Sequence, residues 1–154
     1  MSDSMSAAAP GGATSSGRWV LEDLHEAECL RLISPGGVGR IAFTGRFGPT
    51  VLPVNYKLRD EAIVFRTAEH GPLDQDLRTG IADADYKVAF EIDEIDLAAG
   101  RGWSVLVQGP AHHVEGAELD VVRGAGVEPW APGDRELFVR IIPSRITGRR
   151  VGPA

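Results

Sequence analysis

The feature that most constrains the fold of this chain is a series of short strand-like runs joined by tight turns. Val38–Phe43, Thr50–Leu58 and Ala62–Thr67 are rich in apolar and β-branched residues, and only Gly45–Pro49 and Arg59–Glu61 separate them. Connections this short join antiparallel neighbours and leave no room for a crossover helix. The sequence therefore predicts a three-stranded antiparallel meander at the start of a mainly β domain.

Further strands follow the meander. They are expected at Tyr86–Ile92, Gly102–Val114, Glu136–Ile142 and Ile146–Val151. Gly109-Pro110 interrupts the second of these and predicts a bend or bulge, as barrels need at their corners. Six or seven strands are expected in all, and a closed or partly closed antiparallel barrel is the economical architecture because closure removes exposed edges.

Small helices and one tail complete the predicted organisation. Leu24–Ile33 has apolar residues at helical spacing and ends at Pro35-Gly36-Gly37. Shorter helices are expected within Glu69–Thr79 and Ala117–Gly126. Residues 1–17 are rich in Ser, Ala and Gly and are expected to form a disordered tail, so residues 18–154 make a single domain.

Charge and hydropathy exclude several classes of protein. The 154-residue chain has a formal net charge of −6, which argues against a general nucleic-acid binder. One candidate basic patch remains, for which solubility or subunit contacts are the favoured interpretation: Arg140, Arg145, Arg149 and Arg150. No apolar run approaches the roughly 20 residues that span a bilayer, and the start lacks a secretory signal, so we expect a cytoplasmic protein without a membrane partner.

Most polar motifs have simple interpretations. Cys29 is the one cysteine and is expected to be a buried, inert thiol. His112 and His113 are adjacent on a strand and point to opposite faces, so they cannot chelate one ion, and no metal site is expected. The acidic cluster Glu91, Asp93, Glu94 and Asp96 is interpreted as a solvated strand end.

Two segments are more informative. Val51–Tyr56 places Pro53 inside a strand, and proline cannot donate to a ladder, so this stretch is expected at an edge or around a ligand. Gly102–Val105 opens the longest strand with Trp103 beside Ser104. On these residues alone, the tryptophan is expected to cap the barrel core.

These segments stand in an order that resembles the pyridoxamine 5′-phosphate oxidase-like family, and within it the actinobacterial-type branch of small FMN-binding split-barrel proteins. The resemblance runs from about Leu24 to Val151. The motifs that carry it are Gly39-Arg40-Ile41-Ala42-Phe43, Leu52-Pro53-Val54-Asn55-Tyr56, Val64-Phe65-Arg66-Thr67, Phe90-Glu91-Ile92-Asp93, Gly102-Trp103-Ser104-Val105, Glu128-Pro129-Trp130 and Ile146-Thr147-Gly148-Arg149.

The resemblance implies a six-stranded antiparallel split barrel that forms a homodimer, with two FMN molecules at the subunit interface. It places the backbone of Leu52, Pro53, Val54 and Asn55 beside the flavin ring. It places Arg66 and Thr67 at the ribityl-phosphate, and Trp103 and Ser104 where a second strand reaches the flavin. The family's carboxyl-terminal substrate motif is not evident, so oxidation of vitamin B6 itself is not expected.

The sequence also departs from the family pattern. Relatives usually have a small hydroxyl residue and then Lys or Arg after the Arg-Thr-Ala stretch, whereas this chain has Glu69–Asp74, with Gly71 and Pro72 at its centre. Arg66 and His70 are the remaining candidates for phosphate contact. Three hypotheses follow: an FMN-dependent oxidoreductase of unidentified substrate; a non-enzymatic protein that binds flavin, deazaflavin or haem; and a relative that has lost FMN and acts as an interaction partner.

Overall fold

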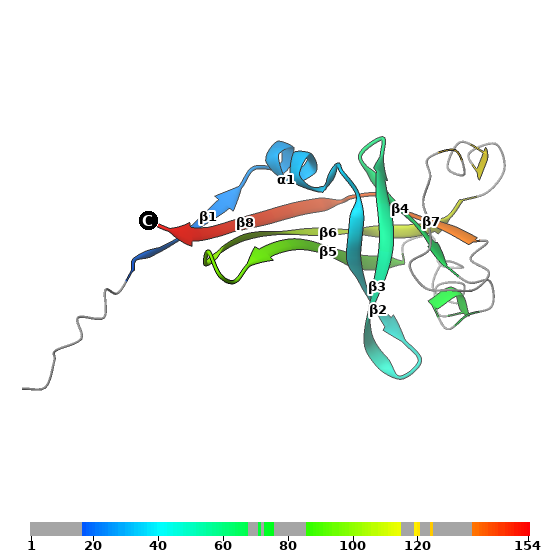
Figure 1. Cartoon of the computed structure of the whole chain (residues 1–154). Coiled ribbons are helices and arrows are strands. Elements are labelled where there is room, and N and C mark those ends of the chain that lie inside the picture. The colour runs from blue at the N-terminus through cyan, green and yellow to red at the C-terminus, as the bar shows by residue number, and fades with distance from the viewer. Residues whose placement is uncertain are drawn as a thin grey trace, which may run out of the picture.

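The computed structural model of the chain describes residues 17–67, 71, 73–75, 86–114, 119–120, 124 and 137–154. The elements whose bounds lie wholly within these residues are the helix α1 and the strands β1–β8, shown in Figure 1. The elements are β1 (Trp19–Leu24), α1 (Glu26–Ile33), β2 (Gly37–Gly45), β3 (Gly48–Arg59), β4 (Ala62–Thr67), β5 (Lys87–Asp96), β6 (Arg101–His113), β7 (Leu137–Ile141) and β8 (Arg145–Pro153).

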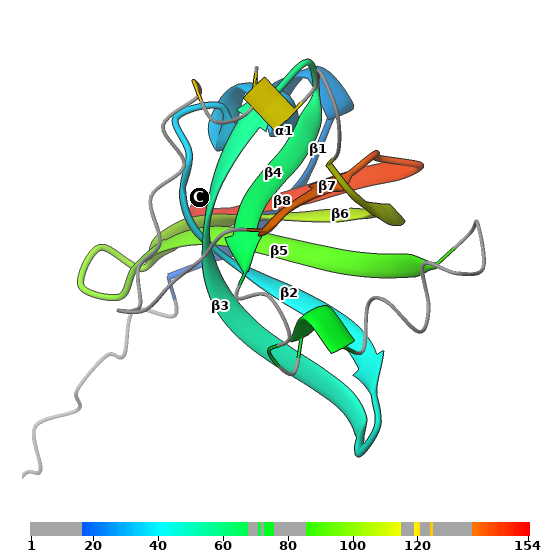
Figure 2. The same ribbon diagram turned by 90° about the vertical axis from the view of Figure 1, so that its right-hand side faces the viewer.

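Six of the strands close into an antiparallel barrel. Their order is β6-β5-β2-β3-β4-β7, and β7 returns to pair with β6. Figure 2 shows β2, β3 and β4 as the meander that the short connections predicted. The predicted mainly β, six-stranded antiparallel split barrel is therefore confirmed.

The barrel corner on β6 falls at the predicted Gly109-Pro110. Residues 102–108 of β6 pair with β8, whereas residues 111–113 pair with β7. A side chain at Gly109 would overlap the carbonyl oxygen of Ile142, so only glycine lets the two backbones approach this closely. The glycine thus marks the point where β6 exchanges one partner strand for another.

The remaining strands extend the sheet beyond the barrel. β1 pairs along its whole length with β8, and β8 pairs with the first half of β6. We call β1, β8 and the β5–β6 hairpin from Asp93 to Ser104 the wing, which extends to the left in Figure 1. No sequence pattern predicts a strand at Trp19–Leu24. This short edge strand is held in place by its pairing with β8, and its side chains are mostly exposed. Its sequence therefore has no regular alternation of apolar and polar residues from which a strand could be predicted.

The core fills the barrel and extends to α1. Phe65 and Phe90 stack with ring centroids 6.0 Å apart, and Tyr56 meets Phe90 edge-on at 5.4 Å. The Tyr56 hydroxyl donates to the carbonyl of Ile33 at 2.8 Å, and burial raises the pKa of Tyr56 to about 12. These contacts fasten the end of α1 to the barrel wall.

The helix covers one side of the wing. Cys29 is fully buried, as predicted, against Gly148 of β8, and burial raises the pKa of its thiol. The predicted helix 24–33 is shorter in the structure, since Leu24 belongs to β1. Glu28 binds Arg150 at 2.8 Å and so ties the exposed side of α1 to β8.

Other expectations fall mostly outside the described residues. The predicted tail lies there except for Gly17, as do most of the predicted helices 69–79 and 117–126. Leu73–Gln75 and Leu119–Asp120 are the helical residues described in those two segments. In the part of the chain that the structure describes, no helix is both long enough and apolar enough to cross a membrane.

Candidate functional site

The side chains of β3 divide between the two faces of the barrel wall. Leu52 and Val54 pack against the core cluster, whereas Pro53 is exposed and Asn55 is half-buried. Successive residues of a strand point to opposite faces, so this division follows from the extended backbone. We call the side that carries Pro53 and Asn55 the outer face. Of the four predicted β3 residues, two therefore present their side chains there.

One edge of β3 is left open by the described strands. β2 pairs with β3 from Gly48 to Tyr56, but β4 pairs only with Tyr56–Arg59. A two-residue turn joins Gly45 to Gly48, so the backbone groups of Gly48 and of every second residue after it bond to β2. Pro53 lies between two such residues, and its backbone nitrogen therefore points to the open edge. The prediction that this proline lies at an edge is confirmed. Proline has no N–H to donate, and at this open edge no neighbouring described strand requires one.

Trp103 and Ser104 lie on opposite faces of β6. Ser104 is cross-strand from Asp93 and Arg149 on the outer face. Trp103 is half-buried and packs against the core on the α1 side, as the residues alone predicted. The structure thus separates two side chains that the resemblance assigned to one flavin, and only Ser104 shares the outer face with Pro53.

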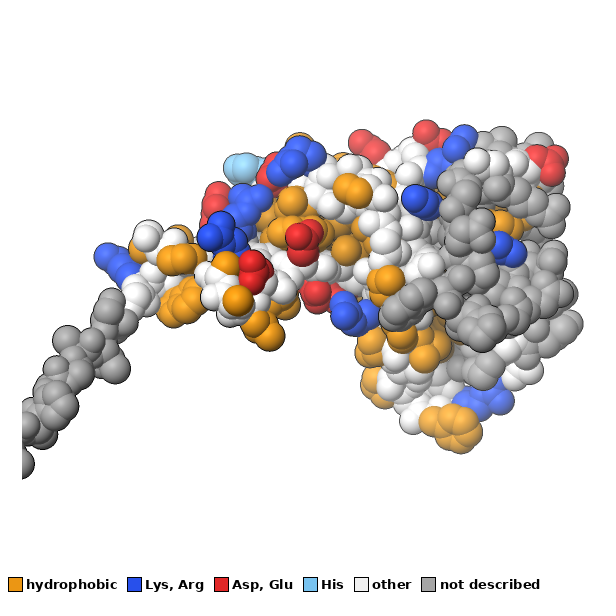
Figure 3. Space-filling model, viewed as in Figure 1, with side chains coloured by type: hydrophobic (Ala, Val, Ile, Leu, Met, Phe, Trp, Pro, Cys, Tyr) orange, Lys and Arg blue, Asp and Glu red, His pale blue; other side chains and the backbone are white. Residues whose placement is uncertain are grey.

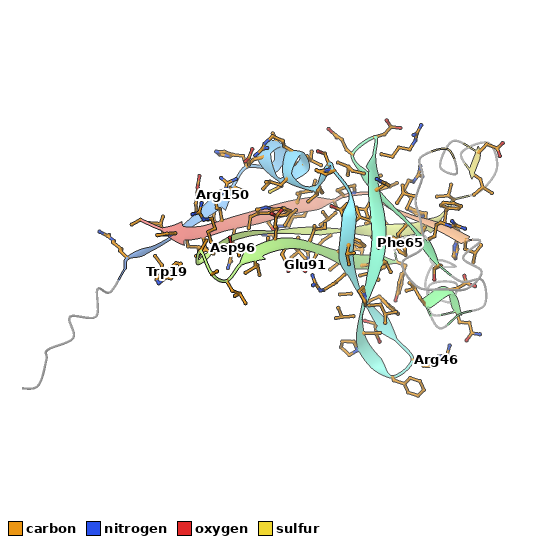
Figure 4. The ribbon with its side chains drawn as sticks, in the orientation of Figure 1. Trp19, Arg46, Phe65, Glu91, Asp96 and Arg150 are labelled. Atoms are coloured by element: carbon orange, nitrogen blue, oxygen red, sulfur yellow. The ribbon has the colours of Figure 1, made fainter. Side chains whose placement is uncertain are left out.

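An ion-pair cluster lies between Pro53 and Ser104. Arg40 of β2 contacts Glu91 at 3.2 Å and Asp93 at 3.3 Å, and its own cross-strand neighbour is Pro53. Burial and the neighbouring Asp93 carboxylate together raise the pKa of Glu91 to about 7, although Arg40 opposes them. Figure 4 shows Glu91 on the side of the sheet opposite Arg150. The Glu91 carboxyl of this cluster therefore holds its proton more tightly than an ordinary glutamate does.

The interpretation of the acidic cluster as a solvated strand end is only half right. Asp93 and Glu91 are two residues apart, so they share the outer face, and their carboxyl side chains are only 27% and 33% exposed. Glu94 and Asp96 are exposed at the far end of the strand. Strand alternation was the signal that could have separated the two pairs, since it sets residues 91 and 93 apart from 94 and 96.

Arg66 and Thr67 also point in opposite directions. Thr67 is 5% exposed, whereas the Arg66 guanidinium lies over the Phe138 ring at 5.3 Å from its centroid. Arg66 follows Phe65, and Asn55 precedes its partner Tyr56, so strand alternation points the side chains of Arg66 and Asn55 to the same outer side of the sheet. The cation predicted for the phosphate therefore lies at the β4 end of the face that carries Pro53.

The segment that departs from the family pattern is partly described. Leu73 is buried in the core, and Asp74 is fully buried with its carboxylate 3.5 Å from Nε2 of His113. Arg46 of the β2–β3 turn donates to the Gln75 side chain at 2.6 Å. Glu69, His70 and Pro72 lie outside the described residues. The side chains of Leu73 and Asp74 thus lie in the barrel interior and not on the outer face.

The outer face is also apolar over much of its area. Val51 on β3 is 60% exposed, and Leu21 and Ile95 on the wing are each 62% exposed. A hollow of about 510 Å³ lies at the base of the β2–β3 hairpin and is lined partly by the small residues Ala42 and Ala89. An exposed apolar face with polar groups at fixed positions is typical of a binding surface.

The arginines of the carboxyl end do not form one basic patch. Arg149 is exposed on the outer face, whereas the next residue, Arg150, points to α1 and pairs with Glu28 and Glu22. Arg140 lies on β7, opposite His112. Among the residues whose placement is described, no group of three potential metal ligands comes together.

Fold and site together define a split-barrel protein with an apolar, partly charged face on its barrel. The chain belongs to the pyridoxamine 5′-phosphate oxidase family, whose model matches residues 25–150. That match includes every predicted site residue and the Arg40–Glu91–Asp93 cluster.

Individual relatives agree with this assignment. An uncharacterized Mycobacterium tuberculosis protein, Rv0080, is 33% identical over 136 residues, which is 88% of each chain. A putative pyridoxamine 5′-phosphate oxidase from Corynebacterium glutamicum has a similar structure, with a TM-score of 0.66, 30% identity and coverage of 87% of this chain and 95% of its own. An FAD-binding protein from Mycobacterium smegmatis has a TM-score of 0.65 and 32% identity, covering 83% and 96%.

Proposed function

We propose that this protein is a cytoplasmic homodimer that binds a flavin on the outer face of its barrel, and that FMN is the flavin. The observation that carries the proposal is the alignment of Arg66, Asn55, Pro53 and Ser104 on one face of the sheet. The strands from β4 to β6 are four steps apart, roughly 19 Å along the curved wall. A relative of 32% identity that binds FAD supports a flavin on this scaffold.

The residues present fit such a group. A flavin has a flat, largely apolar ring with polar edges and an anionic chain. Pro53 and Leu106 offer apolar contact on the outer face, and the Ser104 hydroxyl offers a donor at one end of it. Arg66 supplies a cation at the other end, where a guanidinium forks onto phosphate oxygens.

The chemistry assigned to the bound flavin is transfer of electrons or hydride to a small molecule. The protein's own part is to hold the ring and to set the charge around it. The Arg40–Glu91–Asp93 cluster lies between the strands that carry Pro53 and Ser104. Its charges and the proton on Glu91 would therefore set the electrostatic environment of a flavin ring that reaches from one strand to the other. A binding protein without catalysis on the same face is the second candidate function.

The homodimer is proposed because the outer face is apolar and exposed in one chain. Val51, Leu21 and Ile95 are each at least 60% exposed, and soluble chains rarely leave such surface uncovered. A second copy that covers this face also excludes water from the flavin. The proposed site is then shared between two subunits.

The absorption spectrum of the freshly purified protein tests the cofactor. Bands near ~370 and ~450 nm indicate an oxidised flavin, whereas a Soret band indicates haem. A blue-shifted single band points to a deazaflavin. A protein that stays colourless after incubation with excess FMN or FAD would contradict the proposal.

The Arg66→Ala variant tests the placement of the phosphate. A charge-assisted contact contributes about 1.5–3 kcal/mol, so FMN should bind about 10- to 150-fold more weakly, as measured by fluorescence titration. Riboflavin lacks the phosphate and should be affected much less. Arg59→Ala, at the turn end of β3, is the matched control and should change neither affinity. Equal losses for FMN and riboflavin would remove Arg66 from the phosphate site.

A further inference from the structure

The hollow on the outer face has a floor of two small side chains. Ala42 of β2 is cross-strand from Ala89 of β5, so the sheet there carries two adjacent methyl groups. The same row continues with Val51 of β3 on one side and Gln108 of β6 on the other. Because alanine rises little above the backbone, its larger neighbours stand as walls. The result is the hollow of about 510 Å³, a volume within the range of small-molecule sites.

The two walls of the hollow differ in chemistry. Pro49 and Val51 of β3 form an apolar wall, and Figure 3 shows hydrophobic side chains gathered over the β2–β3 hairpin. The other side is lined by Lys87 of β5, Gln108 of β6 and Ser144, which lies between β7 and β8. Among the described residues that line the hollow there is no carboxylate. The charge of the hollow is therefore that of one lysine ammonium group.

The polar side chains of the second wall are available to a ligand. Within the described chain, no hydrogen bond or ion pair engages the Lys87 ammonium, the Gln108 amide or the Ser144 hydroxyl. The backbone amide of Ser144 donates to the Gln108 carbonyl at 2.8 Å, which holds these two residues together. All three side chains can donate hydrogen bonds, so together they match a ligand group that accepts several.

The hollow borders the Arg40–Glu91–Asp93 cluster. Ala89 precedes Glu91 by two residues on β5, so the cluster is next along the same face, roughly 7 Å away. Both carboxylates of the cluster contact Arg40, at 3.2 and 3.3 Å. Their charge is thus directed to Arg40, which leaves Lys87 as the charge of the hollow. A flavin ring over the cluster would lie beside the hollow.

We infer that this hollow binds a small planar carboxylate, with the anionic group at Lys87, Gln108 and Ser144 and the apolar body on the two alanines. A flat floor of methyl groups suits an unsaturated or aromatic body, whose edge meets the wall at Val51. An ammonium group and neutral donors hold a carboxylate through charge-assisted hydrogen bonds. The identification of this molecule as the substrate of the flavin rests on the proposed function, whereas the binding site itself does not.

An NMR titration of the purified full-length protein with benzoate tests the site. Benzoate carries a planar ring and one carboxylate, whereas benzamide has nearly the same shape without the charge. We expect benzoate to bind roughly ten-fold more tightly than benzamide, because a charge-assisted hydrogen bond adds to the same apolar contact. The backbone amides that shift should be those around Ala42, Ala89 and Gln108.

Substitutions separate the charge of the hollow from its floor. Lys87→Gln should remove most of the preference for benzoate, whereas Lys57→Gln, at the only other lysine of the chain, should keep it. Ala89→Leu should abolish the shifts with both ligands, because the larger side chain fills the floor. Should that variant fold poorly, Gln108→Glu places a carboxylate in the wall and should weaken benzoate but not benzamide.

A parallel titration with FMN separates this inference from the proposed flavin. Benzoate binding that depends on Lys87 supports the site even in a chain that binds no flavin, an outcome that would contradict only the proposed function. Flavin binding without benzoate binding, as when a second subunit fills the hollow, overturns the inference and leaves the flavin standing. Equal losses in Lys87→Gln and Lys57→Gln also overturn it. So does inorganic phosphate that binds as tightly as benzoate, since phosphate has no apolar body.

Discussion

β5 and β6 run through both the barrel and the wing, and they are buried in one and exposed in the other. Within the barrel their inward residues Phe90 and Val107 are fully buried. On the wing, Ile95 of the same β5 is 62% exposed, because no described residue packs over it on that part of the outer face. The same strands thus contribute buried side chains to the core at one end and leave apolar side chains exposed at the other.

The difference separates the part of the molecule that folding buries from the part that the proposed homodimer would cover. The closed barrel satisfies its own strand edges, and α1 covers one side of the wing. The other side of the wing and the adjacent β2–β3 hairpin gain little from folding alone. Stability is therefore expected to depend on barrel residues, and the proposed dimerisation to depend on residues of the wing and of the β2–β3 hairpin.

The largest expected effect of a single substitution is in the barrel core. Phe90→Ala should lower the free energy of unfolding by about 3–5 kcal/mol, because it removes a ring that contacts both Phe65 and Tyr56 and leaves a cavity. Leu97→Ala, at an 89% exposed position of the wing turn, should change it by less than about 0.5 kcal/mol. Urea denaturation of both variants measures the contrast. Similar losses would mean that the wing is as well packed as the barrel.

Two glycines extend the comparison to the backbone. Gly109→Ala should destabilise the protein by about 2 kcal/mol or more, because the new methyl group overlaps the Ile142 carbonyl and forces β6 and the β7–β8 connection apart. Gly152→Ala on the wing is the matched control. Its methyl group would meet only Arg101, at an ordinary distance of 3.9 Å, so the thermal midpoint should hardly move. A tolerant Gly109 would mean that the barrel corner yields easily.

The Arg40–Glu91–Asp93 cluster, where barrel and wing meet, predicts a pH dependence. The pKa of Glu91 is raised by burial and by Asp93 to about 7, so the folded chain binds a proton more tightly than the unfolded chain does. The resulting stabilisation is complete below about pH 4.5 and is lost as the pH rises through about 7. The loss should be on the order of 1 kcal/mol, since solvent screens a carboxyl group that is one-third exposed.

Glu91→Gln should remove most of that dependence between about pH 5 and 8 in urea denaturation at fixed protein concentration. Glu28→Gln is the control. Hydrogen bonds from Arg31 and Arg150 lower the pKa of Glu28 to about 2, so its contribution is complete above about pH 5 and the slope at higher pH should be unchanged. An unaltered slope in Glu91→Gln would show that the cluster does not hold the proton.

The smallest expected effect is at the β3–β4 turn of the barrel. Asp60 and Glu61 have φ values of 49° and 62°, the left-handed pair of a two-residue hairpin turn in which Asp-Gly is favoured. Glu61→Gly should stabilise the protein by about 0.5–1 kcal/mol, because glycine adopts this conformation without a Cβ penalty. Glu61→Ala keeps the Cβ and should give no gain. A gain from alanine would mean that the glutamate charge, and not the backbone, is unfavourable.

The sequence by itself determined the local structure of the barrel. The predicted connections of five and three residues, Gly45–Pro49 and Arg59–Glu61, required antiparallel neighbours, so the meander β2-β3-β4 followed without knowledge of the rest of the chain. Gly109-Pro110 located the corner, because a glycine and a proline fit the point where a strand exchanges partners. These features depend on residues close together in the chain, which a sequence records directly.

Only the tertiary structure decided how the site residues are grouped. Ser104 joins Pro53 on the outer face while Trp103 turns to the core, because the pleat alternates and the closure of the barrel fixes which side is inside. Arg40 meets Glu91 and Asp93 across some 50 positions of sequence, since β2 pairs with β5 as well as with β3. Strand β1 exists only because β8 offers it an edge. Such pairings are set by long-range closure, which no local pattern of residue types specifies.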